Sequence, residues 1–436
     1  MEDCIVTQHP KKSFRNFILL WSGELISAIG SGLTSFGLSV YVFHLTGNAS
    51  AMALVTLLGF MPALLLSPIS GVLADRCDRR LLMILGDGLS ATGLLFILFC
   101  MTSGGAALWQ ICIGVTISSA FSSLMEPAYK ATVTDLLTPA QYTKASGLVG
   151  IAGSAKYLFS PMIAGLLLAI SDIKLLLMLD IVTFFITVTA TLLVRSGLKS
   201  PREFQNTTDI LVRKKQSSVS FLGEFRAGFT AVSQNKGVLL LVIMGAVITL
   251  FLGVIQTLSA PMVLAFANSA TLGAAETICA AGMLVSSILI GFLSIKKGYA
   301  KILSIALFLA GLFMAMFGLY ENIVWICISG FLFFAMLPFA NSSLDYMIRS
   351  NIANELQGRA WGFIGVISQL GYVVAYGFSG MLADGVGRVF GIGVGRGAGL
   401  CIVIAGVLLS GTAVFLYTLK SVKQLENGGG VCTAES

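Results

Sequence analysis

Two ionisable residues lie inside long apolar runs of this 436-residue sequence, where a charge is costly and therefore needs a function or a partner. They are Glu24 in the first run and Lys156 in the fifth. A charge in the middle of a membrane helix costs about 2.5–3.5 kcal/mol on the insertion scale, so such residues serve a function or pair with one another. We expect Glu24 and Lys156 to lie at similar depth and to pair. Glu24 then exchanges a proton as substrate moves, or the two form a fixed salt bridge.

The composition excludes a soluble enzyme. Hydrophobic residues make up 56% of the chain and charged residues only 11%, whereas soluble chains carry about 25% charged residues. The apolar runs are long enough for membrane helices, which need about 20 residues, and they lack the alternation of a membrane β-barrel. We predict an all-α membrane protein whose twelve spans lie near residues 15–43, 50–73, 81–102, 106–127, 145–170, 173–195, 237–266, 272–295, 301–319, 322–345, 358–383 and 397–419.

The positive charge predicts the orientation of these spans. Most of the 27 Lys and Arg residues fall in the N-terminal tail, in the even-numbered connections and after the last span. Cytoplasmic segments of membrane proteins are rich in Lys and Arg, so both termini are expected in the cytoplasm, with the protein in the plasma (inner) membrane. The net charge of +7 then indicates contact with anionic membrane lipid and not with nucleic acid.

The long polar connection divides the chain into related halves. We predict a six-helix bundle over 1–195, a cytoplasmic linker with an amphipathic helix over 196–236, a second six-helix bundle over 237–420 and a disordered cytoplasmic tail over 421–436. The pattern Ser-Gly-x-Leu-Ala-Asp ends span two inside at Asp75 and span eleven outside at Asp384. Inverted repeats of this kind are common in transporters, although chance matching of small residues is the alternative.

A charged cluster follows span two and is the most specific motif of the chain. It consists of Gly71, Asp75, Arg76, Arg79 and Arg80. The glycine allows a close helix contact, and the acid beside three guanidinium groups can form charge-assisted hydrogen bonds to a neighbouring helix end. The alternative is plain positive-inside charge, which needs the cations but not the glycine and aspartate.

This loop resembles the signature loop of the major facilitator superfamily, G-x-x-x-D-R-x-G-R-R, with Asp78 in place of the second glycine. That version is similar to the macrolide and drug-efflux branch, which also includes the enterobactin exporter. Residues 21–24, Asp87 and the Gly358-Arg359 pair resemble the same branch. The resemblance implies two six-helix bundles that rock around a central site, with spans one and five as neighbours.

Span five resembles the antiporter motif of this family in degenerate form. Gly153, Pro161 and Gly165 carry the likeness, and small residues with a proline allow close packing and a bend. Generic membrane packing is the alternative. The arginine that the family carries in span four is absent, since its place falls near Ser118.

Polar residues on spans seven, ten and eleven are candidates for lining a cavity in the second half: Gln256, Asn341, Gln369, Tyr372 and Tyr376. The glycine run 391–399 predicts a flexible tether into span twelve. Two histidines, His9 and His44, and eight scattered cysteines give no metal site. No cofactor is expected, and no nucleotide loop is present, so the energy source is the proton gradient.

These observations predict a monomeric secondary transporter, not an enzyme. Its partners are a small-molecule substrate, protons and membrane lipid. We expect proton-coupled export, or antiport, of amphiphilic or cationic small molecules such as drugs or macrolides, because an acidic residue in the membrane can serve a cation and a proton in turn. Export of a siderophore or metabolite is one alternative. A lipid flippase or a non-transporting membrane sensor is another.

Overall fold

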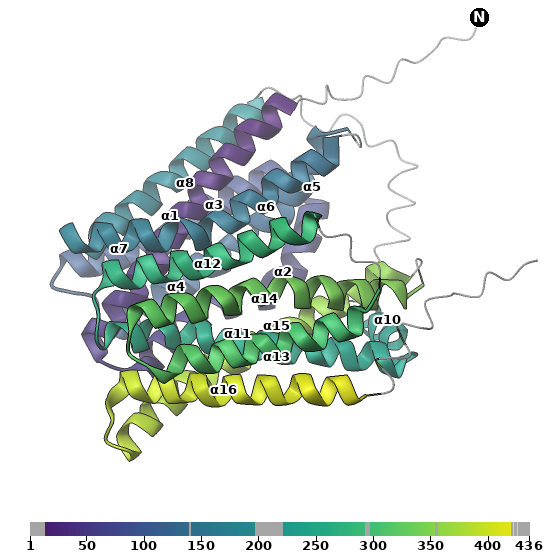
Figure 1. Ribbon diagram of the computed structural model, residues 1–436. Coiled ribbons are helices and arrows are strands. Elements are labelled where there is room, and N and C mark those ends of the chain that lie inside the picture. The colour runs from purple at the N-terminus through teal and green to yellow at the C-terminus, as the bar shows by residue number, and fades with distance from the viewer. Residues whose placement is uncertain are drawn as a thin grey trace, which may run out of the picture. The chain divides into compact units, whose positions relative to one another are not determined.

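The structure is a computed structural model that describes residues 14–138, 141–196, 221–292, 297–353, 356–419, 422 and 425 (Figure 1). These residues form α-helices joined by short loops, and the described part contains no strand. In chain order the helices are α1 Phe14–Thr46, α2 Ala49–Arg76, α3 Arg79–Thr102, α4 Leu108–Ser122, α5 Met125–Leu136, α6 Tyr142–Leu158, α7 Ser160–Ile170, α8 Ile173–Ser196, α10 Phe221–Ser233, α11 Lys236–Leu264, α12 Ser269–Phe292, α13 Tyr299–Leu319, α14 Ile323–Ser350, α15 Gln357–Val389 and α16 Gly393–Thr418.

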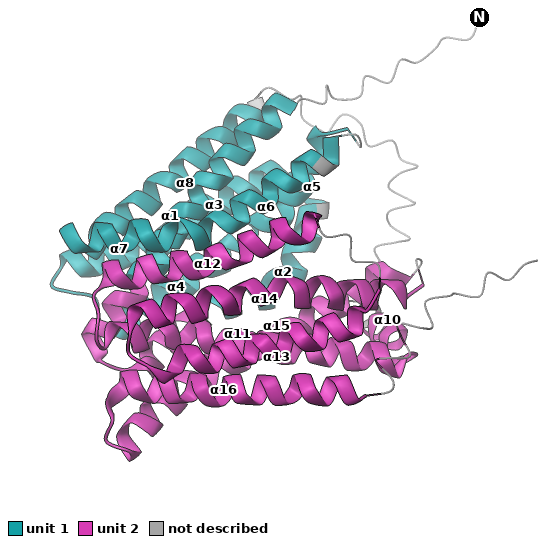
Figure 2. Cartoon of the chain, viewed as in Figure 1, with its two compact units in different colours: residues 1–37, 58–218 teal, residues 38–57, 219–436 magenta. Residues whose placement is uncertain are grey.

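Contacts between helices divide the chain into two compact units (Figure 2). Unit 1 comprises residues 1–37 and 58–218, and unit 2 comprises residues 38–57 and 219–436. The end of α1 and the start of α2 therefore belong to unit 2. Residues 197–220 of the predicted linker 196–236 and most of the predicted tail 421–436 lie outside the described residues.

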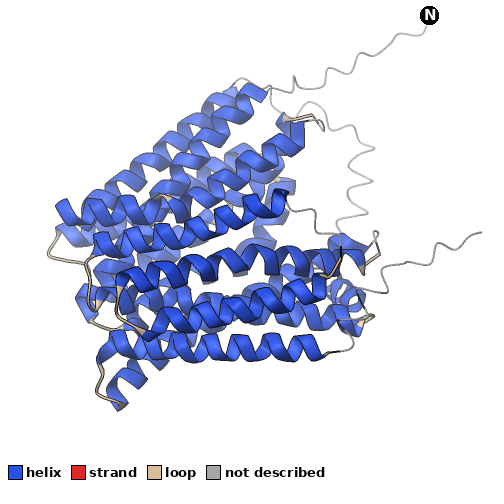
Figure 3. Cartoon of the chain, viewed as in Figure 1, coloured by secondary structure: helices blue, strands red, loops and turns tan. Residues whose placement is uncertain are grey.

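Twelve helical segments in the described residues are long and apolar enough to cross a membrane, which confirms the predicted fold class (Figure 3). The fourth and fifth spans are each broken once. Span four is α4 followed by α5, so it continues to Leu136, well past its predicted end. Span five breaks at Phe159, between α6 and α7, and Pro161 follows in the first turn of α7. Proline suits a first helical turn because its missing N–H is not needed there.

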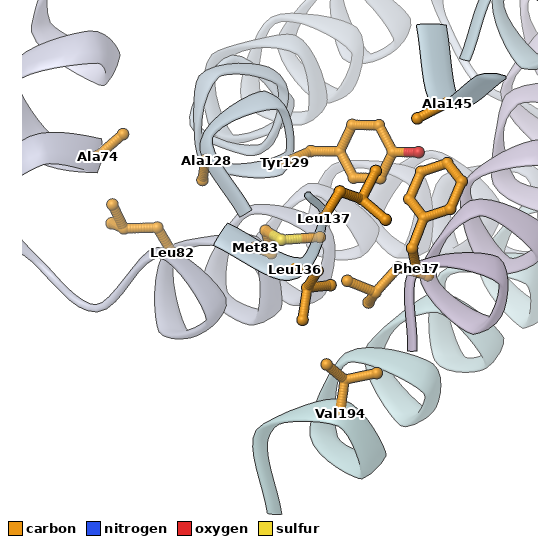
Figure 4. Close-up of a cluster of buried hydrophobic side chains, with 11 residues drawn as sticks. Phe17, Ala74, Leu82, Met83, Ala128, Tyr129, Leu136, Leu137, Ala145 and Val194 are labelled. Atoms are coloured by element: carbon orange, nitrogen blue, oxygen red, sulfur yellow. The ribbon is translucent and has the colours of Figure 1, made fainter. Parts of the chain in front are cut away.

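Unit 1 has an apolar core at the end where α2 gives way to α3 (Figure 4). Buried side chains from α1, α2, α3, α5, α6 and α8 meet there, including Phe17, Ala74, Met83 and Tyr129. Figure 4 shows the Tyr129 ring beside Leu137. This core holds the signature loop and the adjoining parts of six helices against one another.

Unit 2 is held together by close contacts between helix backbones. A side chain on Gly371 of α15 would collide with the backbone of α11 at Ala246, and one on Gly406 of α16 would collide with α13 at Gly311. The prediction of a flexible tether over 391–399 is wrong beyond Gly393. The later glycines lie in α16, where Gly397 contacts Ala383 O of α15. Small residues allow this close approach, and in membranes such packing stabilises helix pairs.

The predicted amphipathic helix is present as α10, and part of its apolar face packs on α15. Phe225 and Phe229 pack on the ring of Phe363 of α15, with ring centres 4.9 and 5.6 Å apart. Gly228 allows this approach, since a side chain there would meet the backbone oxygen of Arg359. The helix therefore docks on α15, while Phe229 stays 47% exposed.

The first turn of α2 is capped by a residue that lies 335 positions away in the sequence. The two carboxylate oxygens of Asp384 accept hydrogen bonds from the backbone N–H groups of Ala49 (2.9 Å) and Ser50 (3.0 Å). Gly380, one turn before Asp384 on α15, lets the two helices touch at Ala49. Further along, α2 contains Pro62 and Pro68.

Candidate functional site

Glu24 lies on α1 inside unit 1, and its Oε2 atom is covered by protein without a hydrogen-bond partner among the described residues. The residue as a whole is half-buried. Neighbouring positions on α1 are fixed by tight contacts. The Trp21 indole donates to Leu148 O of α6 (2.6 Å), and Gly23 lies against Thr187 and Ala190 of α8. The carboxyl group is therefore held in a rigid part of the bundle.

Asp87 of α3 is a second buried carboxyl in the same unit. It is 2% exposed, and its Oδ2 has no hydrogen-bond partner in the described structure. Two other carboxyls, Glu24 and Asp180, act on it electrostatically. Tyr129 of α5, whose hydroxyl is also buried and unpartnered among described residues, lies within range of Glu24. Unit 1 thus gathers acidic groups that sequence spacing did not bring together.

Lys156 does not form the expected ion pair with Glu24. The ion pairs of the described residues involve other groups, and the carboxylate within electrostatic range of Lys156 is Asp180 of α8. Asp180 is 1% exposed and accepts weak hydrogen bonds at 3.4 Å from Ser31 of α1 and from Thr183. The partner was missed because Asp180 falls near the outer end of its apolar run, where hydration is easy.

The signature loop forms a set of contacts that the sequence indicated only in part. Arg79 binds both carboxylate oxygens of Asp135 on α5, at 2.7 and 2.8 Å, and its guanidinium also donates to Ala74 O and Ala131 O at 3.3 Å. Arg80 follows it in the first turn of α3, and Arg76 is exposed. Among the described residues the contact expected at Gly71 is not made, since a side chain there would meet none of their atoms within 4 Å. The Asp75 side chain lies outside the described atoms.

The contacts of Asp78 explain why this loop has an acid at the position of the second glycine of the family motif. Its Oδ1 accepts from the Arg80 backbone N–H at 3.0 Å and caps α3, and its Oδ2 lies 3.2 Å from a guanidinium nitrogen of Arg195 on α8. The preference of helix N-caps for Asp is a sequence signal that identifies the first of these roles. The ion pair with α8 has no such signal.

The motif residues of span five differ in their surroundings. Pro161 and Gly165 are buried in α7, and the adjacent Ser160 donates to Ile29 O of α1 at 3.0 Å. Gly153 of α6 is exposed, and a side chain there would meet no atom within 4 Å. At the place of the family's span-four arginine, Ser118 bonds to Ser90 of α3 (2.8 Å), where the two helices touch at Gly93.

In unit 2, the structure brings together three of the five predicted lining residues. The Tyr376 hydroxyl of α15 donates to Gln256 Oε1 of α11 (2.9 Å), and the Tyr372 ring lies 5.7 Å from that of Tyr376. Gln369 has a covered Oε1 without a partner among described residues. Asn341 lies apart from these, in the wall of a cavity of about 210 Å³ that also includes Asp345 and Trp361.

Comparison with known proteins gives one family and several relatives. The model of the Major Facilitator Superfamily matches residues 20–267. The chain is 26% identical over 388 residues to macrolide efflux protein A of Streptococcus pyogenes, covering 85% of this chain and 90% of that protein. It is 27% identical over 339 residues to macrolide efflux protein A of Enterococcus faecalis, covering 74% of this chain and 98% of that protein.

Two solved structures share the fold at 14% sequence identity. The nucleoside transporter NupG superposes with a TM-score of 0.71, and a bacterial homologue of the iron transporter ferroportin in an inward-facing state with 0.72. Each comparison covers 93% of this chain and 100% of the other chain. At this identity the likeness shows the arrangement of helices alone.

Proposed function

Because the chain belongs to the major facilitator superfamily, we propose that it is a secondary active exporter of amphiphilic or cationic small molecules, such as macrolides, in exchange for protons. As a member of that family it is a multi-pass membrane transporter and not an enzyme. The substrate class is supported by the two macrolide efflux relatives, which match most of this chain. In this proposal both termini are cytoplasmic, the protein acts as a monomer without a cofactor, and the two bundles rock in an alternating-access cycle.

The observation that carries proton coupling is the Glu24 carboxyl, which has a covered oxygen without a hydrogen-bond partner among described residues. A buried carboxylate without a counter-charge is costly, and binding a proton removes that cost. Glu126 acts electrostatically on the same carboxyl, which makes a negative charge on Glu24 more expensive. A cationic substrate or a proton lowers the free energy of the same group, so the two compete for it.

Lys156 has a changed role in this proposal. The sequence pairs it with Glu24, whereas its position favours Asp180 as the group that it neutralises. Glu24 then has no cation partner among the described residues and is the group available for exchange.

The test uses inside-out membrane vesicles, in which export appears as uptake. We expect wild-type protein to accumulate labelled erythromycin when an acid-inside proton gradient is imposed, and an uncoupler to abolish this uptake. Glu24→Gln keeps the shape of the side chain but cannot exchange a proton, so gradient-driven uptake should be lost, and the weakened equilibrium binding that remains should no longer depend on pH.

Asp172→Asn is the matched control, because it removes one acidic charge from an exposed residue between α7 and α8. It should transport normally. Normal uncoupler-sensitive uptake by Glu24→Gln would reject Glu24 as the proton carrier. Wild-type uptake that ignores the uncoupler would reject proton coupling altogether.

A further inference from the structure

An open groove runs along the surface of unit 1 between α1 and α8, which lie side by side (Figure 1). Its floor consists of small residues, since Gly23 of α1 lies against Ala190 of α8. Its rims are large apolar side chains that are exposed, among them Phe185 (63%) and Leu193 (57%). Exposed apolar surface of this kind in a membrane protein marks a contact with lipid hydrocarbon. The occupant of the groove is therefore expected to be apolar.

The described residues that line the groove offer no free hydrogen-bond donor to a polar ligand. Their two hydroxyl groups donate to their own helices, Ser22 Oγ to Leu19 O (2.9 Å) and Thr189 Oγ1 to Phe185 O (2.7 Å). None of these lining residues is charged. Sites for drug-like ligands need a few polar groups that fix the orientation of the ligand. The groove suits a hydrocarbon chain and not the cationic substrate of the proposed function.

The dimensions of the groove fit one acyl chain. Its lining residues on α8 extend from Val182 to Leu193, which is about 16 Å along the helix axis. Half of a typical hydrocarbon core is about 15 Å thick, so the groove spans one leaflet of the bilayer. A volume of about 380 Å³ over that length leaves a channel about 5 Å across, which is too narrow for an α-helix of about 10 Å diameter.

Arg15 places a cation at one end of this groove. It lies on the same face of α1 as Leu19, Ser22 and Ile26, which follow it by four, seven and eleven residues. Because α1 and α8 are antiparallel, this is also the end where Leu193 lies. Arg15 is exposed and forms no ion pair among the described residues. In the predicted orientation this end faces the cytoplasm, where the leaflet is rich in anionic lipid.

We propose that this groove binds one anionic glycerophospholipid, with an acyl chain between α1 and α8 and its phosphate group at Arg15. The guanidinium group forms charge-assisted hydrogen bonds with the phosphate. The small residues Gly23 and Ala190 let the chain approach both helices closely, and Phe185 and Leu193 cover its sides. Bulk lipid is as apolar as these side chains, so close packing and the headgroup contact are what retain this lipid. The site is independent of the proposed function, since its lipid stays bound and is not exported.

Native mass spectrometry of the purified full-length protein tests this site by counting the phospholipids that remain bound. The probes are dioleoyl phosphatidylglycerol and dioleoyl phosphatidylcholine, which share their acyl chains and differ in net charge. Wild type should bind its tightest phosphatidylglycerol about fivefold more strongly than phosphatidylcholine, as one cation at a membrane surface provides. Arg15→Gln should bind both lipids as wild type binds phosphatidylcholine. Thr189→Phe fills the groove from an exposed position and should weaken the binding of both lipids by about fivefold.

Each variant has a matched control. Thr92→Phe makes the same change at an exposed threonine of α3 whose hydroxyl also donates to its own helix, at Leu89 O (2.6 Å). Lys301→Gln removes an exposed cation of α13 that forms no ion pair among the described residues. Both controls should bind the two lipids as wild type does. An undiminished lipid preference in Arg15→Gln would overturn the headgroup contact, and undiminished binding by Thr189→Phe would overturn the groove.

Photolabelling locates the acyl chain without any variant. Wild-type protein in liposomes is irradiated with phosphatidylglycerol that carries a diazirine at the end of one acyl chain. The label should concentrate in residues 182–186 of α8, because a phosphate at Arg15 places the chain end at the opposite end of the groove. A label spread evenly over the exposed faces of other helices would overturn the site. A dimer in the native mass spectra that Thr189→Phe dissociates would assign the groove to a second copy of the chain and overturn it as well.

Discussion

At the scale of single residues, unit 1 contains two acidic groups whose surroundings differ. Asp180 is surrounded by hydroxyl donors and lies within range of Lys156, whereas Glu24 has a covered oxygen without a partner among described residues. The sequence identified Glu24 and Lys156 because a charge inside an apolar run is conspicuous. It could not pair them correctly, because a partner depends on how each helix is rotated about its axis. Hydropathy contains no such information.

This arrangement predicts an asymmetric rescue. Lys156→Gln should lower the thermal stability of the detergent-solubilised protein, because it leaves Asp180 buried without its nearby cation. Adding Asp180→Asn should restore about 1 kcal/mol of that loss, a coupling typical of interacting residues. Adding Glu24→Gln in place of Asp180→Asn should restore nothing. Equal rescue by both changes, or rescue by Glu24→Gln alone, would bring back the pair that the sequence suggested.

At the scale of helices, both units use aspartates to cap a neighbouring or a distant helix end. Asp78 caps the helix that follows it, which an N-cap preference predicts from the sequence. Asp384 caps α2 from α15, which no local rule predicts. The repeated pattern that ends in Asp75 and Asp384 indicated only that the two span ends are equivalent. The structure describes the contact of the second one.

The Asp384 cap should contribute measurable stability. Asp384→Ala removes the acceptor for two N–H groups at the positive end of α2, which should lower the free energy of unfolding by about 1–2 kcal/mol. Asp384→Asn keeps an acceptor oxygen and should lie between the alanine variant and wild type. Hydrogen exchange of a peptide covering residues 47–53 should accelerate in the same order.

Arg388→Ala is the control for this experiment, since it removes an exposed charge one turn further along α15. Its melting temperature and its exchange in residues 47–53 should match wild type. Unchanged exchange in Asp384→Ala would mean that the cap does not hold the start of α2.

At the scale of the whole molecule, hydropathy predicted all twelve spans and most of their ends to within a few residues. The largest miss is span four, where polar residues after Glu126 suggested a loop although they continue as α5. Arg79 explains the helix there, because it binds Asp135 and Ala131 O from α3. An ion pair between residues far apart in the sequence can stabilise a helix in a locally polar segment. Such a pair is hard to recognise from a single sequence.

The orientation of the chain in the membrane is a further prediction from the charge distribution. Cys77 is exposed between α2 and α3, on the side expected to face the cytoplasm, and Cys4 and Cys432 lie outside the described residues. An impermeant maleimide added to intact cells should label none of these three cysteines. Ser103→Cys, exposed between α3 and α4, should react from outside. The opposite pattern would invert the orientation of the whole chain.

The two prolines of α2 lie just beyond residue 57, where this helix passes from unit 2 into unit 1. Residues 49–57 belong to unit 2, where Asp384 holds their first turn, and the rest belongs to unit 1, with Ala74 in its core. Any rotation of one unit against the other must therefore twist or bend α2 between its two anchored ends. Pro62 and Pro68 lie in that stretch, and neither supplies an N–H to the carbonyl four residues earlier. The helix is therefore least stiff between its two anchored ends, and α2 can bend there as an elastic hinge.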